Sequence, residues 1–103
     1  MITAQVGRRQ GKVTSLLVKG HSGLATEGND IVCAGVSSLV QAALLGLGKH
    51  LDRHLFYKVR KGDLQMRLLD APDDLTEAIL ATALLGLREI EKLHPEALKI
   101  MEE

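Results

Sequence analysis

Apolar and polar residues alternate along the first part of the chain. The stretch Ile2–Val6 carries its apolar residues at every second position, which predicts a half-buried strand. A turn follows at Arg8–Gly11, and Val13–Lys19 returns to strand-forming residues, so the two segments predict a β-hairpin. The next segment, Gly20–Asn29, contains three glycines and is predicted to be a loop. Loops of this length in compact domains usually carry function or move.

The pattern then changes to one of helical period. From Asp30 to about His50, apolar residues recur at three-and-four spacing, which predicts a helix with one buried face. Basic residues gather at the end of this segment, where they complement the helix dipole. We expect the buried face to consist of Val32, Val36, Leu39, Val40, Ala43, Leu44 and Leu47.

The second half of the chain repeats the order of the first. Leu55–Arg60 and Leu64–Leu69 flank a Lys-Gly-Asp turn and predict a second hairpin. A second helix is expected from Asp73 or Asp74 to about Leu93, and the residues after it resemble a frayed helical turn. The order β-β-α-β-β-α predicts one two-layer α+β domain over residues 1–103, with two helices packed on one face of a mostly antiparallel sheet. The inward face of the second helix is expected to carry Leu75, Ile79, Ala83, Leu87 and Ile90.

The bulk composition limits the classes of protein to which this chain can belong. Of the 103 residues 46% are hydrophobic and 25% are charged, as in soluble globular proteins, and the first residues do not form a signal peptide. Gly46, Thr82 and Gly86 interrupt the longest apolar runs, so we expect no membrane span. A net charge of zero predicts no general attraction to nucleic acid. One cysteine with scattered histidines fits a reducing cytoplasm and lacks the spacing of a metal site, so no metal or cofactor is expected.

The single cysteine lies where a thiol becomes reactive. If Asp30 caps the helix, Cys33 occupies the first turn, where the positive end of the helix dipole favours a thiolate. Amides of that turn that lack intrahelical partners can bind a developing oxyanion. Ser37 lies one turn further on the same face, and His21, at the end of the preceding strand, can reach the sulfur through the loop and act as its base. These four residues predict an activated sulfur nucleophile.

Each of the four residues also has an ordinary structural role. A lone cysteine in a helix is most often a small buried hydrophobic residue. A lone histidine is more often a surface or capping residue, an aspartate at position 30 caps the helix in either case, and a serine is tolerated within a helix. From these residues alone, an enzyme and a purely structural arrangement both remain open.

The ten residues from Gly28 to Ser37, Gly-Asn-Asp-Ile-Val-Cys-Ala-Gly-Val-Ser, follow an upstream Gly20-His21 pair. Together they resemble the signature of the ribosomal-processing cysteine protease family, Prp. The resemblance covers the whole chain, since the short length, the two hairpins, the motif-bearing loop and the two helices all match the family's order.

For the site, the resemblance implies that Cys33 is the nucleophile, His21 its base, and Asp30 and Ser37 supporting residues. It also implies a mobile loop over the site at Ser22–Asn29. Family members often carry an alanine after the histidine and an aromatic residue in the loop, whereas this chain has serine, glycine, leucine and alanine there. The details of substrate contact are therefore expected to differ. The positions expected to bind substrate or to belong to the lid are Gly20, Ser22, Gly23 and Gly28.

For the function, the resemblance implies a bacterial endopeptidase. Members of the family remove a short N-terminal extension from a large-subunit ribosomal protein, cutting after an apolar motif that ends in phenylalanines, and they form homodimers. We therefore expect this ribosomal protein extension as substrate and a cytoplasmic homodimer, with no membrane partner and no direct nucleic-acid binding.

A second interpretation is a non-catalytic binding protein associated with the ribosome or RNA. It rests on the basic residues that recur between Lys49 and Lys61. Phe56 and Tyr57 are the only aromatic residues, so the stacking platforms of single-stranded RNA binders are nearly absent. The residues better suited to a basic partner are the acidic Asp70, Asp73, Asp74 and Glu77.

Overall fold

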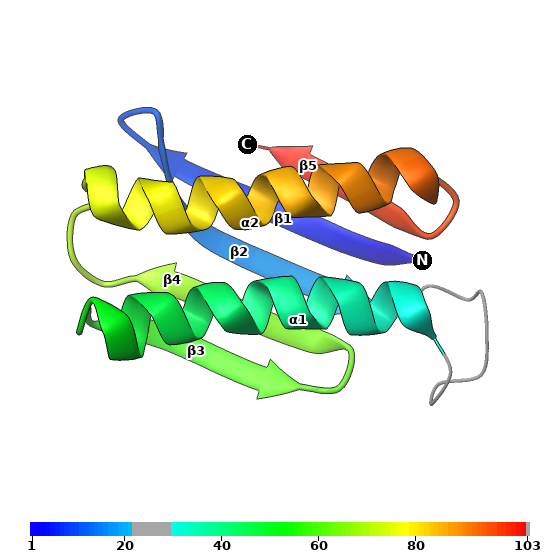
Figure 1. The fold of residues 1–103 in the computed structure, drawn as a ribbon, viewed down its shortest axis with the longest axis horizontal. Helices are drawn as coiled ribbons and strands as arrows, with labels where there is room; N and C mark the ends of the chain where they lie inside the picture. The colour runs from blue at the N-terminus through cyan, green and yellow to red at the C-terminus, as the bar shows by residue number, and fades with distance from the viewer. Residues whose placement is uncertain (22–29, 103) are drawn as a thin grey trace.

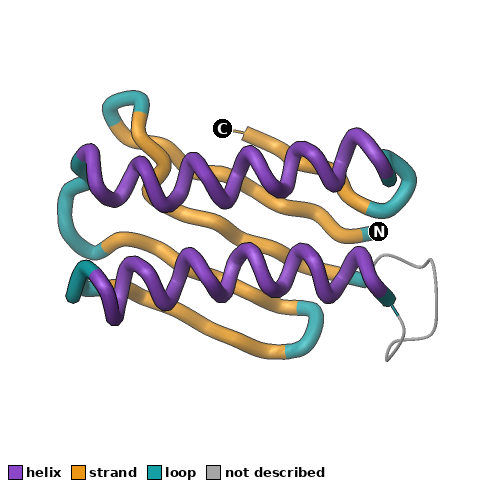
Figure 2. Tube along the Cα trace, in the orientation of Figure 1, coloured by secondary structure: helices purple, strands orange, loops and turns teal. Residues whose placement is uncertain are grey.

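The computed structural model describes residues 1–21 and 30–102. Both helices lie on the same face of one sheet and run antiparallel to each other (Figure 1), and all the strands lie in the layer behind them (Figure 2). The predicted two-layer α+β architecture is therefore confirmed. The elements in chain order are β1 (Ile2–Arg9), β2 (Lys12–Gly20), α1 (Ile31–Leu45), the π-helical turn η2 (Gly46–His50), β3 (Leu55–Arg60), β4 (Asp63–Leu68), α2 (Asp74–Leu93) and β5 (Leu98–Glu102).

The sheet has the strand order β3-β4-β2-β1-β5. Both predicted hairpins are present, since β1 pairs antiparallel with β2 and β3 pairs antiparallel with β4. The two hairpins join where β2 pairs antiparallel with β4, with Lys19 opposite Asp63. This junction matters for function because it brings the end of β2 beside the turn of the second hairpin. Gly20 N–H donates to the carbonyl of Gly62 in that turn, at 3.0 Å.

The C-terminal segment is a strand, so the prediction of a helical turn for residues 96–103 was wrong. β5 pairs parallel with β1, with Leu98 opposite Ile2. The N–H groups of Ala97 and Leu98 both donate to the carbonyl of His94, which ends α2 and turns the chain back toward the sheet. Ala97 and Leu98 are fully buried. The open edge of β1, which no local pattern reveals, decides this conformation.

The predicted first helix is confirmed in extent, because α1 and η2 together run from Ile31 to His50. By length and composition alone this stretch is apolar enough to cross a membrane, which the interrupted runs of the sequence did not suggest. The core helix of a soluble protein meets the same criterion. Here one stripe of the helix packs on the core, and 28% of the apolar window is buried. Its buried residues are Val32, Val36, Val40, Ala43 and Leu47, while Leu39 and Leu44 lie at its borders.

The predicted second helix is confirmed, but its first inward residue is not Leu75, which is 57% exposed. Asp73 caps α2 through a capping box, in which its carboxylate accepts from Thr76 N–H and the Thr76 hydroxyl accepts from Asp73 N–H. This box holds Thr76 inward, and the neighbouring position therefore turns to solvent. The buried residues of α2 are Thr76, Leu80, Ala83, Leu84 and Leu87.

Candidate active site

The N-terminus of α1 is built as the sequence predicts. Asp30 is the N-cap, with an extended backbone, and its carboxylate Oδ1 accepts a hydrogen bond from Cys33 N–H at 3.0 Å. Asp30 is 7% exposed. A carboxylate in this position satisfies a backbone donor that the helix leaves open and fixes the first turn. Cys33 is thereby held one turn inside a helix start, with its side chain partly exposed.

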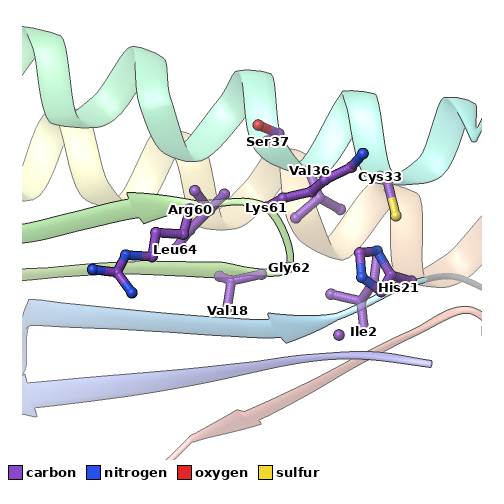
Figure 3. A pocket seen from close by; sticks show the side chains of 11 residues that line it. Ile2, Val18, His21, Cys33, Val36, Ser37, Arg60, Lys61, Gly62 and Leu64 are labelled. Carbon is purple, nitrogen blue, oxygen red and sulfur yellow. The ribbon is translucent and has the colours of Figure 1, made fainter. Parts of the chain in front are cut away.

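His21 follows β2 directly and faces this helix start. Figure 3 shows the imidazole ring and the sulfur of Cys33 directed toward one another from β2 and α1. The ring also lies against the turn of the second hairpin, because a Cβ added at Gly62 would meet His21 Nε2 at 2.9 Å. Gly62 has a φ of +73°, a conformation that glycine adopts without strain. The absence of a side chain at residue 62 therefore leaves the space that the ring occupies.

A pocket of about 130 Å³ lies between these groups. Cys33 and Ser37 of α1 line it from above, and His21 lines it from the end of β2. Apolar side chains form much of the remaining wall. The other lining residues are Ile2, Val18, Gly20, Val36, Arg60, Lys61, Gly62 and Leu64.

Ser37 lines the pocket, but its hydroxyl points along α1 and not toward the sulfur (Figure 3). Its oxygen accepts a hydrogen bond from Gln41 Nε2 at 2.6 Å. Cys33, Ser37 and Gln41 stand at successive four-residue steps and share one face of the helix. Sequence reasoning missed Gln41, although its four-residue spacing from Ser37 was the signal that points to it.

Gly20 is placed in the pocket, as expected of a substrate-binding position. Its φ is +102°, and a Cβ there would collide with the backbone carbonyl of Met1, so only glycine fits. The other expected lid positions, Ser22, Gly23 and Gly28, lie outside the described residues.

From the sequence, Lys61 and Gly62 were predicted as turn residues, and Lys61 also as part of the basic segment. The pairing of β2 with β4 brings their turn to the pocket, so the positive charge of Lys61 lies at the site. The base of this turn is fixed by an ion pair of 2.8 Å between Lys58 and Asp63. The hydrogen bond from Lys58, and then that from Gln65, holds the pKa of Asp63 below its ordinary value.

Part of the basic segment that suggested RNA binding is paired with acidic residues near it. Arg53 bonds Asp73, and His54 Nδ1 lies 3.0 Å from Asp70. Among residues 1–21 and 30–102, no three His, Cys, Asp or Glu side chains gather as metal ligands would. The chemistry available in the pocket is thus that of a thiol, an imidazole and nearby positive charge.

Known proteins resemble this chain in both sequence and fold. The ribosomal processing cysteine protease Prp of Staphylococcus aureus strain Mu50 is 32% identical over 104 residues, which cover 97% of each chain. A crystal structure of the S. aureus protease with a covalently linked product peptide matches over the full length of both chains, with a TM-score of 0.92 and 27% identity. Another, with a substrate peptide, gives 0.86 and 26% over the same span.

The family model described as cysteine protease Prp matches residues 1–99. The match in sequence thus extends over almost the whole chain, and the match in fold covers all of it. It rules out the alternative of a binding protein without catalysis. This chain belongs to the cysteine protease Prp family and is a cysteine endopeptidase.

Proposed function

We propose that this endopeptidase removes the N-terminal extension of a large-subunit ribosomal protein, with Cys33 as nucleophile and His21 as its base. The observation that carries the assignment of roles is the pocket in which the sulfur and the imidazole face one another (Figure 3). The substrate class is supported by the curated S. aureus relative, a ribosomal processing protease.

In the proposed reaction, His21 takes the proton of the Cys33 thiol, and the sulfur attacks the carbonyl carbon of the scissile peptide bond. The tetrahedral intermediate collapses when the imidazolium returns the proton to the leaving amine, which leaves a thioester on Cys33. Water, deprotonated by His21, then attacks the thioester, and the thiol is restored as the acid product leaves.

The oxyanion that forms at the carbonyl needs donors or positive charge nearby. The amide of Cys33 already donates to Asp30, so it is not the donor we assign. The amides of Ile31 and Val32 belong to the same helix end, where the helix dipole favours negative charge. Lys61 lines the pocket and adds a full positive charge. We assign these groups to the stabilisation of the oxyanion.

A synthetic peptide that spans the extension and the mature N-terminus of the host's ribosomal protein tests this function. Mass spectrometry should show a single cut by the unaltered enzyme and none by Cys33→Ala or His21→Ala. His50→Ala is the matched control, since this exposed histidine lies at the far end of η2. Cleavage by the Cys33→Ala protein would refute the assignment of the nucleophile.

The proposed setting is the cytoplasm, where a lone thiol stays reduced. The proposed active form is a homodimer without membrane or nucleic-acid contacts. Sedimentation velocity measured across a range of protein concentrations checks the dimer, and a monomer that retains full turnover would remove it from the proposal.

A further inference from the structure

We infer that β3 is a docking strand for the substrate, which adds to the open edge of the sheet as an extended segment and leads from there into the Cys33 pocket. This inference rests on the proposed function and names how that site holds its polypeptide. Four features of the described structure carry it: the free edge, the direction of its backbone groups, its position beside the pocket and its side chains.

β3 is an edge strand, paired on one side only, with β4. The carbonyl of His54, just before β3, accepts from the N–H of Leu69, which lies opposite in the same register. In an antiparallel pair, hydrogen-bonded positions alternate with positions that are not bonded to each other. Every second residue after His54 therefore bonds to β4, and the intervening Leu55, Tyr57 and Val59 direct their N–H and C=O groups to the open edge.

The strand ends at the pocket. Its last residue, Arg60, and the following Lys61 and Gly62 all line the cavity that contains Cys33. Figure 1 shows β3 running beneath α1 toward the end of that helix where Cys33 lies, and Figure 3 shows the hairpin turn beside His21. A chain that pairs with β3 therefore passes the hairpin turn that lines the Cys33 pocket.

Among the outward-directed residues, Leu55 is partly buried, and Tyr57 and Val59 carry exposed hydrophobic side chains. Tyr57 is 62% exposed and Val59 is 45% exposed. They lie opposite Met66 and Leu64, which are buried under the helices, so they belong to the same face of the sheet as α1. The charged Lys58 lies on the other face and is paired with Asp63. The edge beside α1 is thus apolar.

The opposite edge of the sheet shows how this chain closes an edge that is not used. On β5, the N–H of Ile100 donates to the carboxylate of Glu91 on α2 at 2.7 Å. Glu102 at the end of β5 is bound by Arg8 and Arg88. On β3, no side chain of the described residues bonds the outward N–H of Tyr57 or Val59. Natural sheets block exposed edges with charge, proline or bulges. β3 has no proline, and its Lys58 is held by Asp63 on the face away from α1.

The occupant must therefore be a polypeptide in extended conformation with apolar side chains at alternate positions, which pack on Tyr57 and Val59. From Leu55 to Val59 the edge is about 13 Å long, at roughly 3.3 Å per residue. Backbone hydrogen bonds supply the affinity in such strand addition, and the alternate side chains supply the specificity. Folded proteins do not present such a segment, whereas a flexible N-terminal extension does.

Backbone N-methylation of the peptide described above tests the strand pairing directly. Binding to the Cys33→Ala protein is measured by calorimetry for a series in which each residue in turn carries an N-methyl group. In the segment that pairs with β3, methylation at every second residue should weaken binding about tenfold, and the residues between should have little effect. A flat profile, or one without a period of two, would overturn the inference.

Substitutions in β3 test the same strand pairing by altering the enzyme instead of the peptide. Val59→Pro removes one outward N–H and no hydrogen bond to β4, and it should raise KM about tenfold. Tyr57→Ala should raise KM by a smaller factor, and Leu85→Ala is the control, because Leu85 is 65% exposed on α2. Alkylation of Cys33 by iodoacetamide should proceed at the same rate in all of them. If Val59→Pro fails to fold, the N-methyl series decides, because it leaves the strand unaltered.

The outcomes separate the two proposals. No cleavage of the peptide by the unaltered enzyme refutes the proposed function, and the docking strand with it. Cleavage with a flat N-methyl profile and an unchanged KM in Val59→Pro refutes only the docking strand. A change of sedimentation in Val59→Pro without a change in KM would assign the edge to a second copy of the chain, and this too overturns the inference.

Discussion

The two helices start with the same kind of cap, but the groups around the two helix starts differ. Asp30 caps α1 and Asp73 caps α2, and each carboxylate accepts from the N–H three residues on, at 3.0 Å and 3.1 Å. At α2 the helix start is closed by the reciprocal bond, in which Asp73 N–H donates to the Thr76 hydroxyl, and by the ion pair of Asp73 with Arg53. At α1 the same kind of cap holds a thiol at the mouth of a pocket.

The difference lies in what the sheet and its connections bring to each helix end. The segment after η2 supplies Arg53 to the start of α2, and this cation neutralises the cap. The end of β2 supplies His21 to the start of α1, and the turn of the second hairpin supplies Lys61. A helix N-terminus is thus only a favourable place for negative charge. The neighbours decide whether such a helix start is closed by an ion pair, as at Asp73, or opens on a pocket, as at Cys33.

The largest effect is expected at Gly62, whose missing side chain leaves room for His21. Gly62→Ala places a Cβ 2.9 Å from His21 Nε2 and should lower kcat/KM about 100-fold, since small displacements of a catalytic group cost this much. Gly11→Ala is the matched control, because Gly11 has a similar φ of +79° with no atom within 4 Å. Both variants should lose comparable stability in urea unfolding. An equal loss of activity in Gly11→Ala would show that strain alone is responsible.

Removing each of the two caps in turn should separate an effect on activity from an effect on stability. Asp30→Ala should lower kcat/KM about tenfold and the free energy of unfolding by about 1 kcal/mol, because Cys33 loses the bond that fixes its turn. Asp73→Ala should lower the melting temperature and leave kcat/KM unchanged. Asparagine at either position keeps an accepting oxygen and should recover most of the loss. If Asp73→Ala impaired turnover as much as Asp30→Ala, the two helix ends would not be functionally distinct.

A smaller effect is expected one turn into α1, where Gln41 donates to Ser37 at 2.6 Å. Ser37→Ala and Gln41→Ala should each lower kcat/KM a few-fold, and the double variant should lose no more than either, since the two act through one hydrogen bond. Thr82→Ala is the control on α2, where the hydroxyl donates to the carbonyl of Ala78 at 2.6 Å and does not line the Cys33 pocket. Additive losses would contradict a shared role.

The smallest effect is expected in the dependence of the unfolding free energy on pH. The hydrogen bond from Arg53, then that from Thr76 N–H, holds the pKa of Asp73 below its ordinary value of 3.8. A carboxyl group with a lowered pKa in the folded state stabilises the fold above its ordinary pKa, and this contribution disappears as the pH falls through the lowered value. The difference in unfolding free energy between the unaltered protein and Asp73→Ala should therefore shrink below about pH 4. A difference independent of pH, measured by urea unfolding from pH 7 to pH 3, would contradict this.

Most of the secondary structure could be predicted because its signals are local. The alternation in Ile2–Val6, the turn at Arg8–Gly11 and the helical period after Asp30 each depend on residues close in sequence, and all three are confirmed. One error arose where a distant partner decides the conformation, and the other where the cap at the helix start decides which side of the helix faces inward. Leu98 is in a strand because β1 has an open edge, and Leu75 is exposed because the capping box fixes the rotation of α2.

The sequence by itself determined that Asp30 caps the helix start that carries Cys33, because the two residues are three positions apart. The role of His21 as the base stays a prediction. Tertiary structure alone decided that Lys61 and Gly62 belong to the same pocket. They lie some forty residues from His21 in the chain, and only the pairing of β2 with β4 brings them together. Strand pairing joins residues without regard to their separation in sequence, so no local pattern can encode this side of the site.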